Sequence, residues 1–387
     1  MMPRAVIILS LLLLPVIPAA AGPTEDALRV GQEAFDKKEY GSALTTWVNA
    51  YNERATADTA TDETCATLLT RAAALLAQTG RYKESATCLM NLLKLREKLN
   101  GPEDLATQKV KSLLGAQISN AGGDVDRAEI LVRESAEALA KAGDEHIEDR
   151  LLALTNLAGI LYVKKDRLGA HELYAEVVSL SEKNPGKAPN LAIEAYRSMS
   201  SIADFFGRSK DSLQYLRKSA ELSRKHYGND SPTAIMSRIE VATALTGAGM
   251  NADAKSAYDG IIADLEKKAP SPDEKLLQQR WATAAFRLAA VERTLGNSDR
   301  AFELIKSSLS HAVLGWGDLD ANTLPLYLEL AKQNIVRKNY KEGVRCYQKV
   351  LDIRRRELGP DDKSTRETQQ ILNELLEDVR KAEAGRK

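Results

Sequence analysis

Small residues recur along this chain with a period of 42 residues. One set of them comprises Ala43, Ser85, Ala128, Ala170, Ser212, Ala254, Ala301 and Gly343. The steps between neighbours are 42 residues, with one step of 43 and one of 47. A second small set lies twelve positions earlier, at Gly31, Ala73, Ala116, Ala158, Ser200, Ala242, Ala289 and Ala331. A fixed period of about 20 to 50 residues is the signature of a repeat architecture.

Two further sets of positions predict the internal structure of each repeat. A large residue follows the first small set by four positions, at Trp47, Leu89, Val132, Tyr174, Leu216, Tyr258, Ile305 and Tyr347. A turn position precedes the same set by five, at Lys38, Gly80, Gly123, Lys165, Gly207, Gly249, Gly296 and Lys338. Glycine, found at five of these eight positions, is favoured at the left-handed residue that closes a helix. We therefore predict a helix, a tight turn and a second helix in each repeat, with the small residues where the two helices approach most closely.

The boundaries between repeats are marked by proline, which stops one hairpin and starts the next. The prolines concerned are Pro102, Pro185, Pro189, Pro232, Pro270, Pro272 and Pro360. The 47-residue step predicts a longer loop at residues 269–273. One period beyond Ala331 lies Asn373, which is not small. We therefore expect residues 364–381, with apolar Ile371, Leu372, Leu375, Leu376 and Val379, to form a capping helix with a polar outer face.

The segment Gly80-Arg81-Tyr82-Lys83-Glu84-Ser85 resembles the tetratricopeptide-repeat (TPR) pattern. The period of 42 residues and the sequence between repeats, at residues 227–233 and 358–365, resemble those of the kinesin-light-chain subclass. The resemblance implies an all-α fold, a right-handed superhelical solenoid of about eight helix-turn-helix repeats with a C-terminal capping helix. The chain is accordingly divided into residues 1–21, a repeat solenoid over 22–360, and a capping helix with a polar tail over 361–387.

The first residues have the order of a secretory signal peptide. Arg4 supplies a basic start, residues 5–17 form an apolar run, and Ala19 and Ala21 give a small-residue cleavage site before Gly22. We expect cleavage after Ala21, a secreted or periplasmic protein, and no stable membrane insertion afterwards. The alternative is an uncleaved membrane anchor, although a spanning helix needs about 20 apolar residues and this run is shorter.

Composition agrees with a helical protein and disfavours nucleic acid as a partner. Hydrophobic residues make up 44% of the chain, enough for a packed core, and aromatic residues only 5%, whereas strands draw on aromatic and β-branched residues. Lys plus Arg and Asp plus Glu both number 54, so the formal net charge is zero. No basic block with interleaved aromatic residues is present to grip phosphates.

The three cysteines, Cys65, Cys88 and Cys346, are an odd number for a chain that enters an oxidising compartment. Cys65 and Cys88 fall within one repeat and could pair if their Cα atoms lay about 4.4–6.8 Å apart. Buried, unpaired thiols are the simpler interpretation. No C-x-x-C pair for zinc or redox chemistry occurs.

No arrangement in the sequence indicates catalysis. The four histidines, His146, His171, His226 and His311, lack a second ligand type at metal spacing. The glycines at 115, 122 and 123 are not followed by the Lys-Ser or Lys-Thr of a phosphate-binding loop, and there is no G-x-S-x-G motif. Acid pairs such as Glu145 with Glu148 are explained by solvated charges. We predict a protein that is not an enzyme and uses no metal or cofactor.

The first helices of such a solenoid line a groove that usually binds the partner. In the family, an asparagine two residues before the small first-helix position holds an extended peptide. The matching positions here are Arg29, Arg71, Leu114, Asn156, Ser198, Glu240, Arg287 and Glu329. The groove candidates are Arg71, Asn156 and Arg287, with Arg197 and Arg293 beside them and Tyr162 as an apolar anchor. Arginine can hold a carboxylate by two hydrogen bonds, so an acidic segment or a free C-terminus is the expected ligand.

Alternatives remain at these positions. The simpler interpretation of the arginines is that they are solvated charges that pair with nearby glutamates, and a tyrosine at helical spacing is more often part of the core. We expect a protein–protein interaction scaffold that binds a peptide or protein segment in the groove. The alternative is a structural or assembly factor of the cell envelope that acts through its convex face or self-association, which a large exposed apolar patch would favour.

Overall fold

The computed structural model describes residues 23–57 and 59–384, and its regular structure is entirely helical. These residues form seventeen α-helices and one short 3-10 helix, and no β-strand occurs among them. The all-α fold class expected from the sequence is therefore confirmed. The signal peptide expected at residues 1–21 lies outside the described residues.

The chain divides between Phe206 and Gly207 into two compact units. The first contains α1 (Pro23–Asp36), α2 (Tyr40–Thr56), α3 (Glu63–Gln78), α4 (Tyr82–Asn100), α5 (Leu105–Asn120), α6 (Val125–Lys141), η2 (Asp144–His146), α7 (Ile147–Val163), α8 (Arg167–Lys183) and α9 (Pro189–Phe205). The second contains α10 (Ser209–Tyr227), α11 (Pro232–Gly247), α12 (Asn251–Lys268), α13 (Lys275–Thr294), α14 (Ser298–Gly315), α15 (Leu324–Val336), α16 (Tyr340–Leu358) and α17 (Lys363–Ala384).

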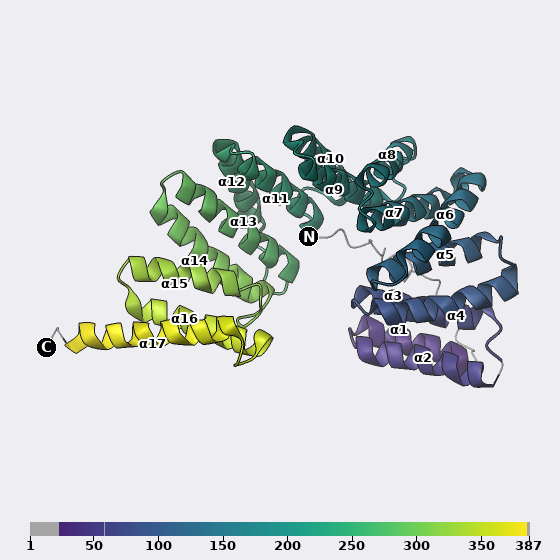
Figure 1. Cartoon of the computed structure of the whole chain (residues 1–387), viewed down its shortest axis with the longest axis horizontal. Helices are drawn as coiled ribbons and strands as arrows, with labels where there is room; N and C mark the ends of the chain where they lie inside the picture. The colour runs from purple at the N-terminus through teal and green to yellow at the C-terminus, as the bar shows by residue number, and fades with distance from the viewer. Residues whose placement is uncertain (1–22, 58, 385–387) are drawn as a thin grey trace. The chain divides into compact units, whose positions relative to one another are not determined.

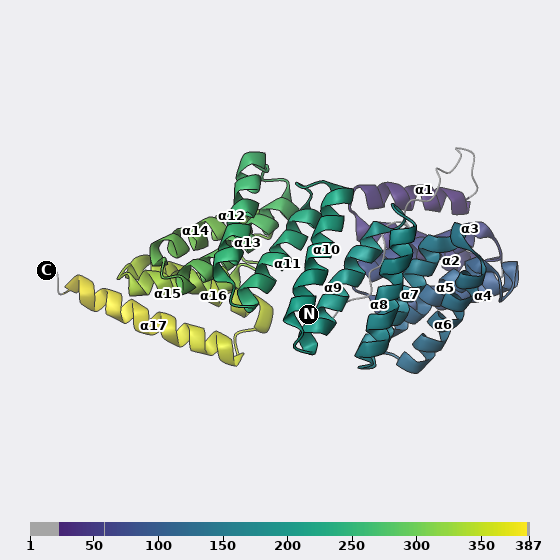
Figure 2. The same cartoon turned by 90° about the horizontal axis from the view of Figure 1, so that it is seen from above.

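Within each unit, helices pack on their neighbours in the order of the chain. Where both helices of a hairpin lie in one unit they contact each other, as α3 does with α4 and α13 with α14. First helices of successive hairpins also contact each other, as in the pairs α5–α7 and α11–α13. Figures 1 and 2 show the resulting stacks of hairpins inside each unit. Because each hairpin contacts only its neighbours, the core is a series of small apolar clusters.

The small residues of both sets are buried, and in the hairpins α1–α2 and α3–α4 they lie where the two helices approach each other. All sixteen positions are buried. The hydroxyl of Ser85 on α4 donates a hydrogen bond of 2.8 Å to the carbonyl of Ala73 on α3, so the two sets face each other directly. At Gly31, an added Cβ would lie 2.2 Å from Nε1 of Trp47. The close approach of the helices therefore explains why these positions are small.

The turns adopt the left-handed conformation that the sequence predicts, except in the third repeat. The residues with positive φ in the eight turns are Lys38, Gly80, Gly122, Lys165, Gly207, Gly249, Gly296 and Lys338. The assignment of this role to Gly123 was wrong, because Gly122 is the left-handed residue and Gly123 is an extra residue after it. A Cβ at Gly115 would lie 2.7 Å from the carbonyl oxygen of Ala128, so Gly115 makes the close approach in this hairpin and keeps the 42-residue step from Ala73.

The seven left-handed residues other than Gly207 complete the same hydrogen-bonded helix end. At the end of α7, the N–H of Lys165 donates to the carbonyl of Tyr162 at 3.1 Å, and the N–H of Asp166 donates to that of Leu161 at 2.9 Å. The corresponding bond at the end of α3 joins Arg81 to Leu76 at 2.8 Å. These are the two bonds of the Schellman motif, which satisfies the last carbonyl groups of a helix.

Replacing Lys165 with glycine should raise the stability of its unit by about 1 kcal/mol. A side chain at positive φ costs about 1–2 kcal/mol, which glycine avoids, although its greater freedom when unfolded offsets part of the gain. Urea unfolding followed by circular dichroism measures the change. Gly80→Ala, at φ +78° in the same type of turn, is the reciprocal control and should destabilise by a similar amount. Equal stability of Lys165→Gly and wild type would contradict this explanation.

The 47-residue step is accommodated by a longer loop and a longer first helix. The loop covers residues 269–274, and α13 has 20 residues. Gln278 fixes this loop, since its side-chain nitrogen donates to the carbonyls of Pro270 at 2.9 Å and Ser271 at 3.0 Å. The two helices α13 and α14 thus keep the usual twelve-residue spacing between Ala289 and Ala301.

The C-terminal helix α17 covers the last hairpin. Leu372 and Leu375 are buried in the same apolar cluster as Val350 and Leu351 of α16. Arg354 of α16 donates to the carbonyl of Ser364 at 2.9 Å, which holds the start of α17 in place. The apolar face of α17 is thus packed on α16 as expected, although Ile371 and Leu376 lie outside that contact and are exposed.

The three cysteines carry free thiols. Cys65 and Cys346 are buried and Cys88 is partly buried. Burial raises the pKa of each of these thiols to about 11, so they are protonated at neutral pH. Among the described helices, none is both long and apolar enough to cross a membrane.

Candidate functional site

Arg71 and Asn156, the two groove candidates at the matching first-helix position in the first unit, are packed between helices. Arg71 of α3 is buried, and its Nη1 donates to the side-chain oxygen of Gln32 on α1 at 3.0 Å. Burial lowers the pKa of this guanidinium. Asn156 of α7 is also buried, and its side-chain nitrogen donates to the hydroxyl of Ser112 on α5 at 3.1 Å. Both side chains therefore join neighbouring first helices.

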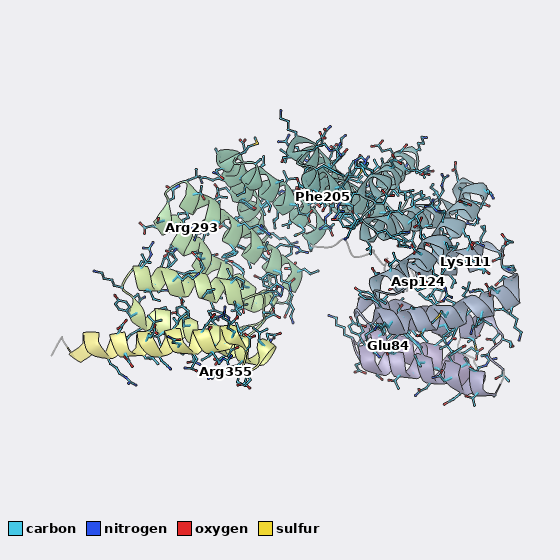
Figure 3. The ribbon with its side chains drawn as sticks, viewed as in Figure 1. Glu84, Lys111, Asp124, Phe205, Arg293 and Arg355 are labelled. Atoms are coloured by element: carbon cyan, nitrogen blue, oxygen red, sulfur yellow. The ribbon has the colours of Figure 1, made fainter. Side chains whose placement is uncertain are left out.

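The remaining arginine candidates differ in their surroundings. Arg197 of α9 forms an ion pair of 3.1 Å with Glu194, one helical turn earlier. Arg287 of α13 is exposed. Arg293, labelled in Figure 3, is also on α13 and forms an ion pair of 2.5 Å with Glu329 of α15. The structure thus brings together Arg293 and Glu329 on consecutive first helices, and it leaves Arg287 accessible.

Tyr162 belongs to a cluster that combines aromatic, apolar and charged side chains in the first unit. The guanidinium carbon of Arg167, at the start of α8, lies 5.3 Å from the centre of the Tyr162 ring and 3.8 Å from that of Phe205. Figure 3 labels Phe205, the last residue of α9. Val163 and Leu168 are the exposed neighbours of Tyr162 and Arg167 in the chain. We call Tyr162, Val163, Arg167, Leu168 and Phe205 the Arg167 cluster.

Arg167 is held by ring contacts and has no acidic partner among the described residues. Its Nε is buried there without a hydrogen-bond partner. The adjacent carboxylate of Asp166 accepts from the N–H of Gly169 at 3.0 Å and so caps α8. The nearby Lys164 pairs with Asp126 at 2.6 Å and with Glu129 at 2.7 Å. The charges around Arg167 are therefore already engaged, while its own charge is not.

Sequence reasoning did not find Arg167, Leu168 or Phe205. A signal was present, because Val163, Phe205 and Val336 all lie five residues after the small first-helix position of their repeats. These three side chains are 45%, 61% and 78% exposed. The contact between Arg167 and Phe205, 38 residues apart in the chain, depends on how one hairpin stacks on the next.

His146 and His311 make contacts with neighbouring side chains. Among the described residues, no group of three or more His, Cys, Asp or Glu side chains is arranged to hold a metal ion. His311 stacks on Trp281 at 3.8 Å and contacts the side chain of Gln278 at 2.6 Å, and burial lowers the pKa of its imidazole. His146 lies beside Glu145 at 3.4 Å. These contacts are structural, and they assemble no acid–base pair around a cavity.

Comparison with known proteins supports the repeat assignment. A family model for the tetratricopeptide repeat matches residues 65–105 and 336–362. These segments cover most of the hairpin α3–α4 and the helix α16. No curated protein matches the chain. The period of 42 residues, now visible as hairpins, fits the kinesin-light-chain-like subclass.

Solved structures share the fold at low sequence identity. One is a signal transduction ATPase with a tetratricopeptide-repeat sensor from Pyrococcus horikoshii, with a TM-score of 0.56, 13% identity, and coverage of 86% of this chain and 53% of that one. The apo form of the quorum sensor NprR from B. thuringiensis has a TM-score of 0.53, 12% identity, and coverage of 85% and 87%. A looser match, with a TM-score of 0.43 and 19% identity, covers 51% of this chain and 94% of a Podosopora anserina protein described as a kinesin light chain with nearly identical TPR-like repeats. The two matched segments and the shared fold therefore identify tetratricopeptide-type repeats in this chain.

Proposed function

We propose that this protein is a non-catalytic interaction scaffold that binds a peptide or protein segment along the face formed by its first helices. Repeat arrays of this kind present long surfaces to their partners. The proposed binding site for the partner is the groove expected along the first helices. The alternative of an assembly factor that acts through its second helices is an outcome of the test below.

The observation that supports the proposal is a repeated exposed apolar side chain. Val163, Phe205 and Val336 occupy the same position at the ends of α7, α9 and α15 and remain largely exposed. Single exposed apolar residues are common, but large ones at the same position in three of the eight repeats favour a shared binding surface. Arg287 and Arg293 on α13 would add charge for an acidic segment or a free C-terminus.

Arg71 and Asn156 have a different part in this proposal. Since both are buried between first helices, they would set the spacing of the helices that the partner contacts. We further propose that the segment before α1 directs the chain to the periplasm or outside the cell, as its sequence suggests.

Site-specific photo-crosslinking of the full chain in its native host tests the proposed face. A photoreactive residue at Val163, Phe205 or Val336 should capture a common protein partner. Ile130 of α6 and Leu358 of α16, similarly exposed on second helices, are the matched controls and should capture no such partner. Mass spectrometry of the crosslinked bands identifies what is captured.

The pattern of crosslinks decides between the two functions. Capture only from the second-helix positions would overturn the proposed face and favour the assembly role. Crosslinks between copies of this chain alone would show self-association. Absence of a common partner at the three first-helix positions would contradict the scaffold proposal.

A further inference from the structure

The Arg167 cluster contains a positive charge that is positioned but not neutralised. The planar guanidinium lies against the rings of Phe205 and Tyr162, and such contacts are favourable for a cation. Stacking restricts the side chain before any ligand arrives. It also leaves the outer N–H groups available, since no described carboxylate pairs with them. An arginine held in this way loses little conformational freedom when it binds a carboxylate.

Exposed apolar side chains belong to the same cluster. Leu168 follows Arg167 in α8 and is 62% exposed, and Phe205 leaves much of its ring in contact with solvent. Val163 occupies in α7 the position that Phe205 occupies in α9, and α7 and α9 are in contact. The cluster thus joins the end of two first helices to the start of a second helix. Arginine and aromatic side chains surrounded by apolar residues are typical of interaction hot spots.

From this arrangement we propose that the Arg167 cluster binds a protein segment that presents one carboxylate next to a large apolar side chain. The carboxylate pairs with Arg167, and the apolar side chain covers Leu168, Val163 and the free part of the Phe205 ring. The inference rests on the proposed scaffold function. It adds a specific place, the edge of the stack where the hairpin turns lie, and a specific chemistry for the partner.

The local charges favour a single carboxylate over a polyanion. Asp166 and Asp204 flank the cluster in the chain, and both would repel a phosphate backbone or an anionic lipid surface. Lys164, three residues before Arg167 in the chain, is already paired with two acids. The guanidinium of Arg167 is therefore the group in the cluster that can pair with a new carboxylate. A partner with a single acid at this point satisfies it without bringing further negative charge against Asp166 and Asp204.

Selection from a phage-displayed library of random dodecapeptides on the full-length protein tests the proposal. The expected result is enrichment of peptides with Asp or Glu beside Leu, Ile, Met or Phe. Arg167→Gln should abolish the preference for the acid and weaken the binding of a selected synthetic peptide by at least about tenfold. Leu168→Ser should weaken the same peptide by a similar factor while leaving the preference for the acid in place. Fluorescence polarisation measures these affinities.

Arg337→Gln is the matched control. The guanidinium of Arg337 lies 4.4 Å from the centre of the Phe302 ring, but it is paired with Asp299 at 2.8 Å, so its loss should leave selection unchanged. Selection of the same peptides by wild type and Arg167→Gln, or no enrichment of the acid–apolar pair by wild type, would overturn the proposal. Neither result would affect crosslinking from Val336, which tests the scaffold function independently. Circular dichroism verifies that each variant is folded.

Discussion

Replacing Trp47 with alanine is expected to destabilise the first hairpin by about 3–5 kcal/mol, the usual range for removing a buried aromatic side chain. Trp47 is fully buried on α2, in a cluster with Leu28 of α1 and Leu68 and Leu75 of α3. Its ring fills the space beside Gly31, so its removal leaves a cavity between three helices that the backbone cannot close. The first hairpin should then unfold before the rest of its unit.

Hydrogen exchange followed by mass spectrometry measures this effect, because a repeat array need not unfold in a single step. Peptides from α1 and α2 should lose protection in Trp47→Ala while those from α7 and α8 keep theirs. Uniform loss of protection over the whole unit would instead indicate one cooperative block. Unchanged exchange in α1 and α2 would contradict the packing role of Trp47.

The fit between Gly31 and Trp47 offers a control by exchange of volume. Gly31→Ala alone should destabilise the hairpin by about 1–3 kcal/mol, the range for overpacking, because its Cβ would overlap the indole ring. The double variant Gly31→Ala with Trp47→Leu reproduces the pair Ala73 and Leu89 of the next repeat. It should recover part of the loss, which a double-mutant cycle detects as coupling between the two sites.

Glu292→Ala should destabilise the second unit by about 3 kcal/mol, at the lower end of the range for breaking a buried ion pair. Glu292 of α13 has no exposed surface, and its carboxylate lies 2.9 Å from Nζ of Lys255 on α12 and 3.1 Å from Nε of Arg300 on α14. It therefore joins three helices. Both cations are partly exposed and can recover hydration, which limits the loss. Urea unfolding measures the difference.

The exposed pair of Glu303 and Lys306 on α14 provides the control. Glu303→Ala should change stability by less than about 0.5 kcal/mol, because exposed ion pairs contribute little. Equal effects of the two substitutions would contradict the special position of Glu292.

The contribution of Glu292 should also depend on pH. Burial alone would raise the pKa of its carboxyl, but the contacts with Lys255 and Asn297 and the charge of Arg300 outweigh burial and lower it. A lowered pKa in the folded state means that the stabilisation is complete above the unfolded value of about 4.3 and is lost as the pH falls through the folded value. The range from pH 6 to pH 8 lies above the unfolded value of about 4.3, so the stability difference between wild type and Glu292→Gln should be constant there. The difference should shrink below about pH 4.

The repeat fold could be predicted from the sequence because steric contact selects residue size directly. Ala73 and Ser85 are small because the two helices of a hairpin approach closely. The same constraint applies in the other hairpins, so small residues recur in the sequence with the period of the repeat. The third repeat was placed one residue off at Gly123, because Gly115 and Ala116 are both small and the spacing alone does not tell which one faces the second helix. Lysine at the left-handed turn positions Lys38, Lys165 and Lys338 shows that position in the period predicts conformation even where residue type does not.

The candidate site was less accessible to sequence reasoning. A first-helix position can face a groove or the neighbouring first helix, and a rotation of one residue separates the two. Arg71 and Asn156 face the neighbouring helix, where their hydrogen bonds connect repeats. The Arg167 cluster was missed because it is assembled from two hairpins. No short segment of the sequence contains both Arg167 and Phe205.

The pairing of a small residue with a large one inside each hairpin limits how this protein can be recombined. The space between the two helices of a hairpin is shared by Gly31 with Trp47 in one repeat and by Ala158 with Tyr174 in another. A complete hairpin moved to another position keeps both the small residue and the large residue that fit each other. A single helix exchanged between repeats would place Ala158 opposite Trp47, where the ring has room only for a glycine. The hairpin, and not the helix, is therefore the unit in which this solenoid can be lengthened, shortened or shuffled.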